Sequence, residues 1–164
     1  MKTISVFMLI YAVMVIPSQQ EKHVEAEGIR ASYCFRNNTM HFELSAPTTG
    51  WVALGLNSTD QLQGSSLIMC RVQDGQVEIV DHFVRAPGDY LPVTDLGQSS
   101  LVQEISGTEI EGKSSFAFTL PLKPESPYHH TIVIGSEFTM HLAYSVSDDF
   151  QHHSIKRTKR HVVW

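Results

Sequence analysis

Apolar and polar residues alternate along most of the chain after Gly28, which is the pattern of half-buried β-strands. The alternation is clearest in residues 40–44 and 114–120, where every second position is apolar. Residues 130–135 are nearly continuous in apolar and β-branched side chains, which predicts a strand buried on both faces. Further strands are expected at residues 50–57, 67–72, 76–83 and 138–146. The pattern predicts an all-β fold, an antiparallel β-sandwich of about eight or nine strands.

Turn signals separate these strands. Asp74-Gly75 lies between two apolar runs and suits the positive φ angles of a two-residue hairpin turn. Residues 85–100 contain two prolines and two glycines, and this predicts a long irregular loop, a kind of segment that is often functional. The most helix-like stretch, residues 59–66, is short and is broken by Gly64, so no helix is expected.

The start of the chain has the pattern of a secretory signal peptide. Lys2 precedes an apolar run from Ile4 to Ile16, and the small residue Ser18 follows. A membrane anchor is the alternative, but a spanning helix needs about 20 apolar residues. We therefore expect an extracellular protein without a transmembrane segment in its mature chain. The expected divisions are a signal peptide (1–18), an N-terminal segment (19–27), the sandwich (28–147) and a C-terminal basic segment that packs on the domain or trails from it (148–164).

Cysteines and glycosylation motifs bear on the same expectation. An oxidising compartment would allow Cys34 and Cys70 to form a disulfide bond, and the alternative is two buried free thiols. The sequence also contains two sequons, in which Asn37 and Asn57 would carry the glycans. Both sequons fall in polar, turn-like stretches. The expectation is a secreted glycoprotein with one disulfide bond.

The charge of the chain limits its partners. Once Lys2 leaves with the signal peptide, 11 basic and 17 acidic residues remain, a formal charge of −6. An acidic body disfavours non-specific nucleic-acid binding, so nucleic acid is not an expected partner. Near the end of the chain Arg157, Lys159 and Arg160 form an Arg-x-Lys-Arg motif, which proprotein convertases cleave. The preferred interpretation is a solvated basic tail, with cleavage as the alternative.

Catalytic motifs are not evident in the sequence. There is no Gly-x-Ser-x-Gly motif and no phosphate-binding glycine loop, so we expect a protein that is not an enzyme. Histidine is the enriched reactive residue, with nine in the chain. His41, His82 and His141 fall on strand faces that look polar, and a surface position is expected for each. Adjacent histidines on a strand point to opposite faces, so neither His129-His130 nor His152-His153 is expected to chelate one ion by itself.

The motifs from about Gly50 to Arg157 together resemble the DOMON domain family, extracellular β-sandwich modules that bind haem or sugar. "GWVALGLN" is similar to the opening strand of the family, and "QGSSLIMCRV" to the strand after it. "DYLPVTDLGQ" resembles the proline-aspartate loop, and "FTLPLKPESPYHHTIVIG" the stretch that leads to the next strand. "HLAYSVSDDFQHHSIKR" is similar to the last strand and its terminal His-x-x-x-Arg.

The resemblance also indicates where haem would be held. In haem-binding members a methionine and a C-terminal histidine bind the iron, and these positions correspond to Leu62 and His153. Leu62 has no donor atom, so the resemblance implies a five-coordinate iron held by His153 alone. Met69 lies seven residues after Leu62, and we expect it to be too far along the chain to substitute. Ser66 and Leu120 also depart from the family pattern, with aspartate and arginine expected there.

Three functions are compatible with this sequence. The first is a secreted domain that binds a small molecule, with haem b as a candidate cofactor. The second is a carbohydrate-binding or protein-interaction module that has lost haem, with stacking surfaces from Trp51, Tyr90, Tyr128 and Trp164. The third is an extracellular redox or electron-transfer component. The ligand itself stays open at this point.

Overall fold

The computed structural model describes residues 21–164, and the expected signal peptide lies outside the described residues. Within that range the chain forms eleven β-strands and no helix. No helix in this part of the chain is therefore long or apolar enough to cross a bilayer. The strands are β1 (Lys22–Ala26), β2 (Ile29–Arg36), β3 (Thr39–Ala46), β4 (Val52–Asn57), β5 (Ser66–Gln73), β6 (Gln76–Ala86), β7 (Asp89–Pro92), β8 (Gln103–Ile110), β9 (Lys113–Pro121), β10 (Glu137–Tyr144) and β11 (Lys156–Val163).

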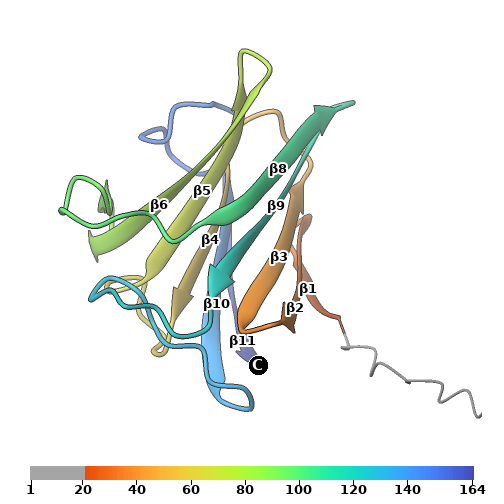
Figure 1. Ribbon diagram of the computed structural model, residues 1–164. Helices are drawn as coiled ribbons and strands as arrows, with labels where there is room; N and C mark the ends of the chain where they lie inside the picture. Colours follow the sequence, from red (N-terminus) through yellow and green to blue (C-terminus); the bar gives the residue numbers. More distant parts are fainter. Residues whose placement is uncertain (1–20) are drawn as a thin grey trace, which may run out of the picture.

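The strands form two antiparallel sheets packed face to face (Figure 1). The first sheet has the order β1-β2-β3-β9-β8, and the second has the order β11-β10-β4-β5-β6-β7. The all-β sandwich expected from the alternation is confirmed, with eleven strands in place of eight or nine.

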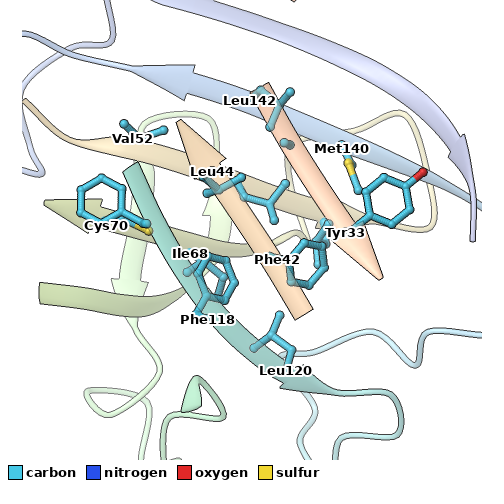
Figure 2. Packing of buried hydrophobic residues seen from close by; sticks show 14 of the residues in the cluster. Tyr33, Phe42, Leu44, Val52, Ile68, Cys70, Phe118, Leu120, Met140 and Leu142 are labelled. Atoms are coloured by element: carbon cyan, nitrogen blue, oxygen red, sulfur yellow. The ribbon is translucent and has the colours of Figure 1, made fainter. Parts of the chain in front are cut away.

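The main core lies between the two sheets, where the inward-facing side chains of both meet (Figure 2). Phe42 of β3 stacks on Phe118 of β9 at a centroid distance of 5.4 Å. Ile68 and Met140, from the second sheet, are fully buried in the same layer. Burial of such side chains contributes about 1.5–3 kcal/mol each, so this layer supplies most of the stability of the sandwich.

The hairpin predicted at Asp74-Gly75 is confirmed. Gln73 and Gln76 are paired across it, and Asp74 and Gly75 have φ angles of 52° and 74°. Residues with small or absent side chains tolerate this left-handed conformation, which matches the twist of the flanking strands.

Two expectations about local structure are wrong. Residues 130–135 form a loop rather than a buried strand, and Val133 and Ile134 are 56% and 46% exposed. Only Ile132 packs into the core, because its amide pairs with the Leu122 carbonyl and the chain then turns at Ser136. The irregular loop expected at 85–100 is shorter than predicted, since β7 lies within it and pairs with β6.

The sandwich also extends beyond the expected limits of 28 and 147. Residues 22–26 pair with β2, and residues 156–163 pair along their whole length with β10. The C-terminal basic segment is therefore an edge strand and not a trailing tail. Arg157, Lys159 and Arg160 lie in this strand, so convertase cleavage would require β11 to separate from β10.

The structure contradicts the expected disulfide bond. Cys34 and Cys70 are both free and buried. Cys70 of β5 faces the core between the sheets (Figure 2), whereas Cys34 lies on the opposite face of β2 from the core residue Tyr33. The two thiols are separated by the first sheet, and a disulfide requires Cα atoms within about 7 Å.

Candidate functional site

A shallow floor of small residues lies on the outer face of the second sheet. Val52, Leu54 and Ile68 point into the main core, so their neighbours point outwards. Among these neighbours Ala53 of β4 pairs with Ala143 of β10, and Gly55 pairs with His141. A Cβ atom added to Gly55 would lie 3.1 Å from the Cβ of His141. The lack of side-chain volume here leaves open space above three neighbouring strands.

Larger side chains surround this floor and form an apolar cavity of about 480 Å³. Such a volume is typical of small-molecule sites, which measure about 300–1,000 Å³. Trp51, Leu67, Met69 and Val84 form a second buried cluster, against which Leu62 packs. The remaining lining residues come mainly from the β10–β11 loop and from β11. They include Gln151, His152, His153, Ser154, Arg157, Thr158 and Lys159.

The loop between β10 and β11 (blue in Figure 1) is fixed against the second sheet by several contacts. Arg71 of β5 donates to the Asp148 carbonyl at 2.7 Å, and its guanidinium lies 4.3 Å from the ring centroid of Phe150. The hydroxyl of Tyr90 donates to the carbonyl of Phe150. These contacts hold the loop beside the cavity without any disulfide.

The structure brings the two positions taken from the family resemblance together. His153 and Leu62 line the same cavity, although 90 positions separate them in the sequence. His153 is exposed at the cavity, and its backbone carbonyl is held by the Ser145 hydroxyl at 3.1 Å. Within residues 21–164 neither ring nitrogen of His153 has a hydrogen-bond partner, whereas Nδ1 of His152 lies 3.0 Å from the Ser145 hydroxyl. His153 therefore offers a free imidazole to a ligand.

Sequence reasoning missed two further donors in this cavity. Met69 is 2% exposed and lines the cavity from β5, so it lies there without the shift in strand register that the sequence suggested. His141 lines it from β10 and is partly buried, contrary to the expected surface position. Burial lowers the pKa of His141, an effect that the nearby Gln61 carbonyl partly opposes. The period-two alternation places both residues on the outward face, which was the signal that could have found them.

His82 is also misplaced by the sequence analysis. It is 2% exposed and packs edge-on against Tyr90 and Phe150, with ring centroids 5.5 and 5.8 Å away. Burial lowers the pKa of His82, while its contact with the Val80 carbonyl and the charge of Asp81 raise it. His41 matches its expected position more closely, since its side chain is 30% exposed beside Glu104.

A different buried histidine supports the loop on the other side of β6. Nε2 of His129 lies 2.8 Å from a carboxylate oxygen of Asp81, and its Nδ1 lies 2.9 Å from the Ser126 hydroxyl. The same carboxylate accepts a hydrogen bond from the Leu101 amide. The cavity near His129 measures only about 10 Å³, so this Ser-His-Asp arrangement has no room for a substrate and joins two loops instead.

The two sequons have different environments. Asn37 is exposed in the turn between β2 and β3, where a glycan would extend into solvent. Asn57 is 2% exposed, and its amide nitrogen donates to the carbonyls of Gln61 and Gln63 at 2.7 and 2.9 Å. The folded domain thus contradicts a glycan at Asn57, because the nitrogen that would carry it is used to shape the β4–β5 loop.

The aromatic residues considered for sugar stacking are mostly unavailable. Trp164 is 3% exposed and packs edge-on against Tyr33 at 5.1 Å. Trp51 is 4% exposed within the second cluster. Only Tyr90 and Tyr128 are partly exposed, and Tyr128 packs against Phe83 at 5.0 Å.

Comparison with known proteins agrees with this architecture. A model of the family described as the DOMON domain matches residues 25–158, which is most of the chain. Among solved structures the chain is similar to the cytochrome b domain of pyranose dehydrogenase from Coprinopsis cinerea. The TM-score is 0.65 at 8% sequence identity, and the match covers 88% of this chain and 80% of the other. At this identity the likeness concerns the fold. The family match and the two-sheet architecture together show that this chain belongs to the DOMON domain family.

Proposed function

We propose that this protein is an extracellular haem-binding domain in which His153 holds the iron. The observation that carries the proposal is the free imidazole of His153 at an apolar cavity of about 480 Å³. The cytochrome b character of the similar fungal domain supports the same ligand class. Secretion is part of the proposal, supported by the signal-like start of the chain and the exposed sequon at Asn37.

The residues around the cavity fit a haem group. A flat apolar ligand needs a floor without projecting side chains, and Ala53, Gly55 and Ala143 supply one. A haem also carries carboxylates, which need cations at the edge of the site. Arg157 and Lys159 are exposed at the rim, and Arg157 has no acidic partner within the described residues. Apolar walls with a few polar groups are typical of small-molecule sites.

Each part of the chain has a separate task in this account. A bound haem would supply an iron that can accept and release one electron. His153 would hold that iron through a ring nitrogen and orient the group. Trp51, Leu67 and Val84 would exclude water from one face, and apolar surroundings of this kind tune the properties of an iron site. Arg71 and Tyr90 would keep the His153 loop in position.

The other two functions receive unequal support. Carbohydrate binding loses two of its four stacking residues, since Trp51 and Trp164 are buried. An extracellular electron carrier remains the second candidate, because the similar fungal domain is a cytochrome b domain of a dehydrogenase. That function would use the same haem site and would need a redox protein as its partner.

The experiment is an absorption titration of the purified protein with haemin. We expect a Soret band that saturates at one equivalent, and we expect His153→Ala to lose it. His152→Ala is the matched control, because its neighbouring ring is bonded to Ser145, and it should bind as the wild type does. A wild type that fails to bind, or a His153→Ala variant that binds equally well, would overturn the proposal.

A further inference from the structure

His141 contains a buried polar atom with no partner. Its Nε2 is inaccessible to solvent and makes no hydrogen bond among residues 21–164. Other buried histidines are engaged, as His129 is with Asp81 and His130 is with the Gly64 carbonyl at 2.8 Å. Leaving a buried polar group without a partner costs about 1–3 kcal/mol, so such an atom calls for an explanation.

The position of His141 supplies one. It lines the same cavity as His153, and it stands next to Gly55, the residue without a side chain in the floor. The Gln61 carbonyl is its near neighbour and directly precedes Leu62. Leu62 occupies the position at which the family resemblance places the second iron ligand. A donor nitrogen therefore lies beside the place where this chain lacks a donor side chain.

We infer that His141 is the second ligand of the haem iron, opposite His153. The inference rests on the proposed function, and it replaces the five-coordinate iron implied by the sequence with a bis-histidine one. Imidazole nitrogen is a common haem ligand, and binding iron would satisfy the orphaned Nε2. The β10 strand would then carry a ligand that other members supply from the β4–β5 loop.

Met69 is the competing donor in the cavity. Its side chain is 2% exposed and packs with Trp51, Leu67 and Val84 as a normal apolar residue. A buried thioether leaves no strong polar group unsatisfied, so its position needs no ligand to explain it. His141 differs in having a strong acceptor or donor that nothing in residues 21–164 satisfies.

The test compares the spin state of the haem-loaded protein in absorption and electron paramagnetic resonance spectra. We expect the wild type to be six-coordinate and low-spin. His141→Ala should keep haem through His153 but become high-spin, and Met69→Leu should stay low-spin. A second variant, His141→Met, keeps a donor of similar reach and should remain low-spin with a raised reduction potential, since methionine ligation raises the potential.

Several outcomes would overturn this inference. A high-spin wild type, an unchanged His141→Ala spectrum, or a shift to high-spin in Met69→Leu would each do so while leaving haem binding through His153 intact. A wild type that binds no haem would instead contradict the proposed function itself. The two failures are thus distinguishable in one set of spectra.

Discussion

Arg71 and Phe150 join the outer face of the second sheet to the loop that carries His153. The guanidinium of Arg71 lies 4.3 Å from the centroid of the Phe150 ring, and it also pairs with Glu78. Because this cation is fixed on β5, it sets the height of the loop above the cavity floor. The site is thus positioned by a sheet residue and not by a covalent link.

Tyr90 makes the second contact to that loop, and its removal is a direct test of loop positioning. Tyr90→Phe loses only the hydrogen bond to the Phe150 carbonyl, so we expect a loss of about 1 kcal/mol in stability and weaker haem binding. Tyr128→Phe is the matched control, because Tyr128 lies by Phe83, away from this loop. Calorimetry and haemin titration of both variants give the answer, and equal effects in the two would refute the assignment.

The size of the cavity floor predicts a variant that blocks the site without breaking the core. Ala143→Leu adds volume on the outward face of β10, above Ala53 and Gly55. We expect haemin affinity to fall by at least about tenfold, the equivalent of about 1.4 kcal/mol, with little change in melting temperature. Haem binding equal to that of the wild type would place the ligand elsewhere.

The central strands were predictable from sequence because they face apolar layers. Residues 40–44 and 114–120 alternate cleanly, since one face of β3 and β9 packs into the main core. The edge strands β8 and β11 were not predictable in this way. In β11 only Val162 is buried, and in β8 no residue is, so neither strand shows apolar alternation.

The site was predictable only in part. The resemblance placed His153 and Leu62 in the right cavity, but His141 and Met69 required the pairing between β10, β4 and β5. Motifs were poor guides where side-chain direction decides the outcome. Cys34 and Cys70 lie on different faces of different sheets, and a list of cysteines does not contain that information.

The thiols give a prediction about redox state. Unreduced, denatured protein should take up an alkylating reagent at both cysteines, as read by intact mass, because both are free. In the native protein Cys70 should react very slowly, since burial raises the pKa of its thiol and the core excludes the reagent. Alkylation that appears only after reduction would show a disulfide and contradict the structure.

Asn57 should matter for stability and not for glycosylation. Asn57→Ala leaves the carbonyls of Gln61 and Gln63 without their donor, and we expect a loss of about 1–3 kcal/mol in the free energy of unfolding. Peptide mapping of secreted protein should find a glycan on Asn37 alone. Glycan on the Asn57 peptide, or a fully stable Asn57→Ala variant, is the contrary result.

His82 predicts a dependence of stability on pH. Its pKa is lowered in the folded domain, so the unfolded chain binds the proton more readily. The stability from the neutral ring is therefore present above the unfolded pKa of about 6.5 and is lost as the pH falls through it towards the lower folded value. Melting curves between about pH 7 and pH 5 should decline less steeply for His82→Gln than for wild type. The exposed His23→Gln serves as control, and parallel curves for all three proteins would contradict the assignment.

The most direct test of the account is chemical rescue of the ligand position. His153→Gly should bind haemin poorly, and added free imidazole should restore the Soret band, because the small molecule can occupy the space left by the side chain. Variants that retain Leu62 and the cavity floor provide the same surroundings for both measurements. A wild-type spectrum of His153→Gly without imidazole would contradict the claim that His153 holds the iron.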